Sequence, residues 1–139
     1  MTDAIWGYGT LLELGDGIGG FVTIAEVMDF PGPQLSRDNK DVTSHSSPNG
    51  YDEFIMTLKR SGEMGFTLNF FNDATQDFST GVGSLYDSGE IRPWRITAPA
   101  SVFTIEFEAY VSGFKTQFPV NGQITADTTL KLSGQVVFA

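Results

Sequence analysis

Alternating apolar and polar residues dominate the last third of the chain. In residues 101–114, apolar side chains hold every second position from Phe103 to Val111, with threonine, glutamate and tyrosine between them. Residues 123–134 repeat the pattern with isoleucine, alanine and leucine against threonine, aspartate and lysine. Because successive side chains of a β-strand point to opposite faces, we predict two strands, each with one buried and one solvated face. Residues 119–122 (PVNG) form the turn between them.

Shorter patterns predict four more strands. Residues 10–14 and 21–28 are apolar with several β-branched side chains, and the glycine-rich stretch between them predicts a hairpin turn. Residues 63–71 alternate, and residues 90–97 are also predicted to form a strand. We expect the latter at an edge of the sheet, because Pro93 has no N–H to donate to a second neighbour.

A single helix is predicted over residues 73–89. Asp73 and Gln76 have the spacing of a capping box at its start, and Gly89 is suited to its end. Gly81 weakens the helix by about 1 kcal/mol relative to alanine. Four apolar residues share one helical face, which would cover the apolar face of the sheet; they are Phe78, Val82, Leu85 and Tyr86.

Residues 31–50 show no regular period. The stretch is polar and contains three prolines, so we predict a long loop with at most a short strand around residues 40–45. Loops of this length usually have a function or are ordered by a partner. We expect one domain over residues 1–139, with residues 1–9 as an N-terminal arm. The predicted fold class is mainly β: an antiparallel, sandwich- or barrel-like domain with one flanking helix and a long terminal hairpin.

The charge balance narrows the possible partners. Seventeen acidic and eight basic residues give a net charge of −9 and a pI near 4.3. A protein that binds DNA or RNA through phosphates is expected to be basic instead. The acidity serves solubility, or it belongs to a surface that must lie near nucleic acid without binding it. No apolar run approaches the ~20 residues of a membrane span, so we expect no membrane partner.

Residues capable of catalysis or metal binding are sparse. His45, the only histidine, lies among serines and carboxylates, but no cysteine or second histidine accompanies it. We predict that its side chain hydrogen-bonds within the loop. Gly15, Gly17 and Gly20 match the dinucleotide fingerprint, yet a strand follows them instead of a helix, so we interpret them as a turn. We therefore predict no catalytic residue, no cofactor and no metal site.

An ordered series of segments resembles a known family. The segments that show the resemblance are residues 23–70, from "TIAEVMDF" to "FTLNF", residues 92–99 ("RPWRITAP") and residues 107–134, which begin "FEAYVSGF". Together they resemble the tail tube proteins (major tail proteins) of long, non-contractile-tailed, lambda-like bacteriophages. The likeness extends over residues 11–134, and each motif is weak by itself, whereas their order is specific.

The resemblance implies a structural protein and not an enzyme. Such subunits form rings of six that stack into a hollow tube, whose inner wall is a continuous β-barrel. The implied partners are further copies of this chain and the tail-tip, tape-measure and tail terminator proteins, while DNA passes through without specific binding. We expect the protein in the virion tail, assembled in the host cytoplasm.

The resemblance also assigns a role to the segment "DVTSHSSPNGYDEF" (residues 41–54). It is similar to the family's long loop, which is implied to contact neighbouring subunits. The candidate contact residues are Asp38, Asp41, Thr43, His45, Tyr51 and Phe54.

Acidic residues on the polar strand faces are candidates for the lumen of such a tube. They alternate with apolar residues that must pack beneath the helix, so they point away from the core. A wall of the same sign as DNA offers phosphates no attractive binding position. The predicted lumen-facing residues are Glu63, Glu106, Glu108 and Asp127.

Three alternatives remain open from the residues. The chain is also compatible with the tube protein of a contractile tail or a related secretion apparatus. An acidic β-barrel that holds an apolar ligand among its phenylalanines is a second possibility. A hydrolase that uses the strand carboxylates is the third, although acids on the solvated faces of strands are ordinary.

Overall fold

The computed structural model describes residues 4–16, 18–60, 62–71 and 73–139. These residues form eight β-strands, one α-helix and two single-turn 3-10 helices. The 3-10 helices, η1 and η2, are Pro48–Gly50 and Pro99–Ser101. The other elements are β1 (Leu11–Gly15), β2 (Phe21–Thr23), β3 (Ser36–Asp41), β4 (Phe54–Arg60), β5 (Glu63–Asn69), α1 (Val82–Ser88), β6 (Arg92–Thr97), β7 (Thr104–Gln117) and β8 (Thr125–Phe138).

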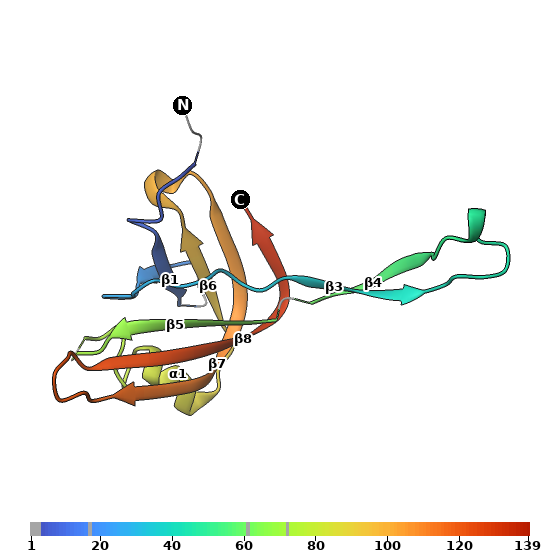
Figure 1. The fold of residues 1–139 in the computed structure, drawn as a ribbon. Helices are drawn as coiled ribbons and strands as arrows, with labels where there is room; N and C mark the ends of the chain where they lie inside the picture. The colour runs from blue at the N-terminus through green and yellow to red at the C-terminus, as the bar shows by residue number, and fades with distance from the viewer. Residues whose placement is uncertain (1–3, 17, 61, 72) are drawn as a thin grey trace.

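Six of the strands make one antiparallel sheet, in the order β2-β1-β6-β7-β8-β5. The long β7–β8 hairpin runs through the whole sheet, which curls so that β5 and β1 lie in differently oriented halves (Figure 1). The register of the β7–β8 pair shifts between Glu106 and Glu108 and again between Val111 and Gly113. Shifts of this kind are β-bulges, which bend a sheet. The predicted β-rich, antiparallel class with a single flanking helix is confirmed.

The core lies on the concave face of the curled sheet. Alternate residues of β7, such as Phe107, Ala109 and Val111, are buried there as the alternation predicts. Trp94 of β6 is fully buried and donates its indole N–H to the backbone carbonyl of Ala109 at 3.3 Å. Helix α1 packs against β7 and contributes Val82 to the core. Each large apolar side chain buried in this way contributes about 1.5–3 kcal/mol to folding.

The helix is much shorter than predicted. Residues 73–81 form turns, and α1 begins only at Val82. The cause is local competition: the carboxylate of Asp73 accepts the N–H of Thr75, and that of Asp77 accepts the N–H groups of Ser79, Thr80 and Gly81. Phe78 and Tyr86 are consequently exposed, so only half of the predicted apolar face is buried. The predicted end at Gly89 is confirmed by its left-handed conformation (φ 67°).

Gln76 does not act as the reciprocal partner of a capping box. Its side chain is fully buried and forms three hydrogen bonds to backbone groups. It accepts the N–H of Phe71 at 3.0 Å and donates to the carbonyls of Ala25 at 2.7 Å and Asn69 at 2.9 Å. Gln76 therefore joins three segments of backbone at the side of the sheet.

Strand β6 is central and not at an edge, so that prediction is wrong. It lies between β1 and β7. Pro93 is tolerated because the β1 ladder ends one residue away, at the pair between Leu14 and Trp94. Gly15 follows Leu14, and a Cβ atom added to it would lie only 2.5 Å from the proline ring. Glycine at the end of β1 thus leaves room for proline in an interior strand.

The N-terminal hairpin is confirmed, but its second strand is short. β2 pairs with β1 and ends at Thr23, well before the predicted end at residue 28. The chain then crosses to the other side of the sheet, where Val27 forms an isolated bridge with Leu68 of β5. In the turn, the carboxylate of Asp16 accepts the N–H of Gly20 at 3.0 Å. Gly17, part of the predicted turn, lies outside the described residues.

The predicted loop over residues 31–50 is partly a strand. β3 pairs with β4 in a separate two-stranded ribbon, which we call the arm (residues 36–60). The arm projects far from the rest of the molecule (Figure 1). Neither strand has a buried side chain, so the sequence of β3 shows no apolar alternation from which a strand could be predicted.

Candidate assembly surfaces

The convex face of the six-stranded sheet is polar. In its upper half, Glu13 of β1, Arg95 of β6 and Glu106 of β7 stand side by side in register. The Arg95 guanidinium lies 2.6 Å from the carboxylate of Glu13 and 3.8 Å from that of Glu106. Ion pairs across three strands therefore hold this part of the face together.

The four predicted lumen acids all lie on this one face. Glu106, Glu108 and Tyr110 alternate along β7, and Tyr110 is paired with Lys131, which is paired in turn with Glu63 of β5. Asp127 lies four residues before Lys131 on the same side of β8. The structure thus places Glu63, Glu106, Glu108 and Asp127 on the same face of the sheet, as alternation predicted. They do not form one cluster, because Lys115, the partner of Asp127, is nine residues along β7 from Glu106.

Asp127 is held more firmly than a freely solvated acid. Its two carboxylate oxygens accept hydrogen bonds from the hydroxyl of Thr67 on β5 and the amide of Gln117 on β7, both at 2.7 Å. Lys115 faces it across the β7–β8 pair. Asp127 therefore links three strands near one end of the sheet.

Glu13 is an acid that sequence reasoning missed. It is only 7% exposed, and its carboxylate accepts hydrogen bonds from Arg95 at 2.6 Å and from the hydroxyl of Thr97. Burial raises the pKa of this carboxyl, but the two hydrogen bonds and the charge of Arg95 outweigh burial and leave the pKa below its ordinary value. The guanidinium also lies 4.1 Å from the ring centroid of Phe21. In the sequence, the available signal for a special role of Glu13 was its position as the one charged residue of the apolar segment "TLLEL".

The arm is the second candidate surface. The apolar side chains of β4 are between 50% and 68% exposed; they are Phe54, Ile55, Met56 and Leu58. An isolated two-stranded hairpin is at best marginally stable in water, and a contiguous exposed apolar patch is typical of an interaction site. The arm therefore has the character of a segment that a partner covers.

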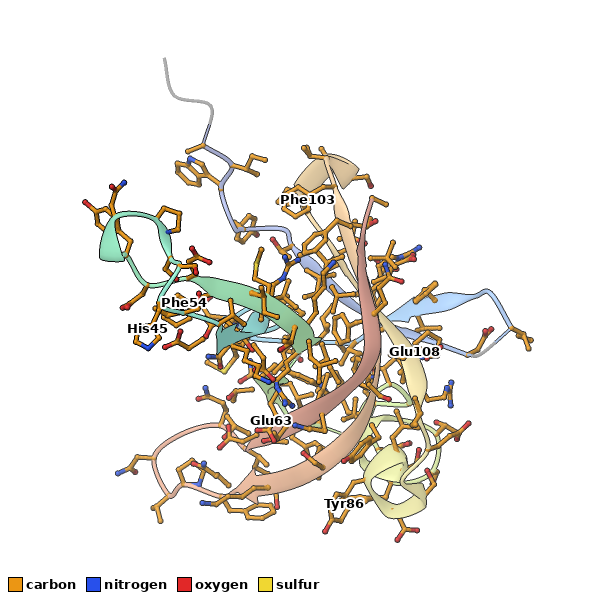
Figure 2. The ribbon with its side chains drawn as sticks, turned by 90° about the vertical axis from the view of Figure 1, so that its right-hand side faces the viewer. His45, Phe54, Glu63, Tyr86, Phe103 and Glu108 are labelled. Atoms are coloured by element: carbon orange, nitrogen blue, oxygen red, sulfur yellow. The ribbon has the colours of Figure 1, made fainter. Side chains whose placement is uncertain are left out.

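All six predicted contact residues lie on the arm. Asp38 and Asp41 are on β3, Phe54 begins β4, and the others are in the loop between them. Figure 2 shows the exposed side chains of His45 and Phe54. Asp38 forms an ion pair with Arg60 at 2.8 Å, and the hydrogen bond from Arg60 lowers the pKa of Asp38.

The end of the arm is organised by its own hydrogen bonds. The carboxylate of Asp41 accepts the N–H of Thr43, and the hydroxyl of Thr43 accepts the N–H of Glu53, both at 2.8 Å. The prediction that His45 hydrogen-bonds within the loop is wrong. Its exposed side chain forms no hydrogen bond to any residue that the structure describes.

Other classes of site find no support in the described part of the chain. No three or more His, Cys, Asp and Glu side chains are grouped there in a way that could hold a metal ion. Within the same residues, no helix has the length and apolar character needed to cross a bilayer.

Comparison with known proteins identifies the family. The model of the lambda phage tail tube protein, TTP, matches residues 14–139 of this chain. The chain belongs to that family. It is a tail tube protein of a phage-like tail, a structural component of the virion particle, and the resemblance found in the sequence is confirmed. No curated protein sequence shows significant similarity to it.

Solved structures show the same tail tube fold. The tail of an empty gene transfer agent (GTA) particle, refined with C6 symmetry, matches with a TM-score of 0.80 and 18% identity over 98% of this chain and 99% of that chain. A chain of the sheath/tube terminator structure of an extracellular contractile injection system, PVC, gives a TM-score of 0.75 and 15% identity over 100% of this chain and 99% of that chain. The SPP1 tail tube protein gives 0.72 and 10% over 97% and 78%. At these identities the likeness shows the fold alone, which contractile and non-contractile systems share.

Proposed function

We propose that this tail tube protein assembles into hexameric rings that stack into a hollow tube for genome delivery, and that it has no catalytic role. The observation that carries the proposal is the arm: a projecting hairpin with no buried side chain, whose apolar residues need a partner. The C6 symmetry of the related GTA tail supports a ring of six.

Free strand edges support closure of the ring. β2 and β5 are the outer strands of the six-stranded sheet; residues 26–28 cover the end of β5 at Thr67–Asn69, so its open edge within the described residues is Glu63–Phe66. β8 continues past Lys131, the last of its residues that pairs with β5. Exposed edges are templates for pairing with another chain, and a closed barrel removes them. Pairing between neighbouring subunits would satisfy these backbone groups all around the ring.

Apolar side chains at the two ends of β7 support head-to-tail stacking. Trp6 is 83% exposed and, with Phe103, lines a small groove at the N-terminal end of the molecule. Val120 is 99% exposed in the β7–β8 turn, at the opposite end of that strand. Two different exposed surfaces at opposite ends favour a heterologous contact, which extends a stack instead of closing a dimer.

We further propose that the polar face bearing Glu106 and Glu108 lines the lumen. On this face Glu106 is half-buried and Glu108 is exposed, while the opposite face is occupied by the core. DNA would then pass a wall of like charge without specific binding. Tail-tip, tape-measure and terminator proteins are the partners proposed for the two ends and the interior of the tube.

Negative-stain electron microscopy of the purified chain, combined with a sedimentation profile, tests the proposal. We expect six-fold rings or hollow tubes whose fraction increases with protein concentration. A tail-tip complex is added where the subunit alone stays small, because nucleation of the first ring can limit assembly. A compact monomer that persists with that complex present would contradict the proposed function.

A further inference from the structure

An open cleft of about 980 Å³ lies where the arm joins the body of the molecule. One wall is the base of the arm, and the other is the part of β8 that extends past its pairing with β5. This volume is at the upper end of the range for ligand-binding pockets, and an open cleft of that size can receive a turn of polypeptide. Its lining includes Leu35, Arg37, Lys59, Arg60, Lys131, Val136 and Phe138.

The cleft is basic in an otherwise acidic protein. Four of the eight lysines and arginines of the chain line it; they are Arg37, Lys59, Arg60 and Lys131. Asp38 neutralises Arg60, and Glu63 lies 4.0 Å from Lys131. Arg37 and Lys59 are opposite each other in the arm and make no ion pair within the described residues. The cleft therefore presents positive charge beside an apolar wall.

The far end of the same arm has the complementary character. Residues 41–53 contain three acids, Asp41, Asp52 and Glu53, and no lysine or arginine. Tyr51 and the adjacent Phe54 add exposed aromatic surface. The two ends of the arm therefore differ in charge. The tip is acidic and aromatic, and the end that joins the body is positively charged.

The tip of an arm cannot occupy the cleft at its own base. The β3–β4 register keeps both strands extended, and β3 alone spans roughly 20 Å between the base and the tip loop. Figure 1 shows the tip at the greatest distance from the body. Any tip that enters a cleft must belong to a different copy of the chain.

We propose that the arm tip of one subunit docks in the basic cleft of a second copy, with Asp52 and Glu53 facing Lys59 and Arg37. The contact joins two different surfaces, the tip of one copy and the cleft of the next, so it can continue around a ring or along a stack. It rests on the proposed function, and it names the surfaces that join the subunits. Exposed charge pairs are screened by salt, so this contact weakens as ionic strength rises.

Charge reversal tests the contact in the full-length chain. Asp52→Lys with Glu53→Lys, or Arg37→Glu with Lys59→Glu, should each raise the concentration for half-assembly by about tenfold or more. Combining all four substitutions in one chain should restore assembly. The tip variant combined with Lys115→Glu, on the polar face of the sheet, is the matched control and should show no rescue. Circular dichroism of each monomer checks that the fold is intact.

Cysteine cross-linking gives a second readout, because the chain has no cysteine. A Glu53→Cys variant mixed with a Lys59→Cys variant should yield cross-linked heterodimers with a short bismaleimide, in tubes or in concentrated monomer. Glu53→Cys mixed with Lys115→Cys should yield none. Failure of both the rescue and the specific cross-link would overturn the tip-to-cleft contact. If every variant formed tubes equally well, the tip-to-cleft contact would also be overturned. The proposed function, assembly into a tube, would not be contradicted by that result.

Discussion

At the scale of single residues, buried polar groups hold together segments that are distant in sequence. Glu13 and Arg95 are 82 residues apart, yet their ion pair joins two neighbouring strands under the ring of Phe21. Gln76 does the same for three backbone segments. An unpaired partner in either place would carry the full cost of desolvation, so these side chains contribute more than a typical surface hydrogen bond.

Replacing Glu13 with glutamine should lower the free energy of unfolding by about 1–3 kcal/mol at pH 7, because the partly buried Arg95 guanidinium loses its nearer carboxylate and keeps only Glu106, 3.8 Å away. The pKa of Glu13 is lowered on folding, so its contribution is fully present above the unfolded pKa near 4.5. It is lost as the pH falls through the lower, folded pKa. Urea denaturation at several pH values should therefore show a difference between wild type and variant that shrinks in acid.

Glu108→Gln, on the exposed part of the same face, is the matched control and should change stability little at any of these pH values. A Glu13 variant whose deficit stays constant down to the acid limit of folding would contradict the role assigned to the ion pair.

At the scale of elements, local hydrogen bonding overrides the helical period in residues 73–81. Asp77 binds three consecutive backbone N–H groups, and the chain folds back so closely that Gly81 touches it. The arm shows the opposite case: its strands form without any core, and their apolar residues remain exposed for a partner.

Gly81→Ala distinguishes the observed turn from the predicted helix. A continuous helix would gain about 1 kcal/mol from alanine. In the structure, the added Cβ would lie 2.3 Å from the backbone nitrogen of Gln76, so we expect a loss of about 1–3 kcal/mol instead. Thermal or urea denaturation decides the sign. Gly32→Ala, where the added Cβ meets nothing within 4 Å, should be close to neutral.

At the scale of the whole molecule, three surfaces differ in character. The concave face of the sheet is occupied by the core, the convex face carries the acids, and the arm projects from the body (Figure 1). This separation leaves the strand edges, the arm and the charged face outside the core, where the proposed assembly would use them.

Lysine at positions 106 and 108 tests the lumen assignment. Glu106→Lys with Glu108→Lys should leave tubes intact but slow or block genome delivery, because phosphates then meet attractive charges along the wall. Electron microscopy of the tails and infectivity of the particles measure the two effects separately. Asp87→Lys with Glu90→Lys, near α1, changes the charge equally and should deliver normally. Equal infectivity of both variants would place the acids outside the lumen.

Local pattern alone predicted the strands of the curled sheet and the shared face of the four acids, because period-two alternation records which side is buried. The ordered motifs also identified the family. Only the tertiary structure decided that β6 is central, that β3 is a strand and that Glu13 meets Arg95. Each depends on pairing between distant segments, or on a strand with no buried side chain, and neither leaves a periodic signal in the sequence.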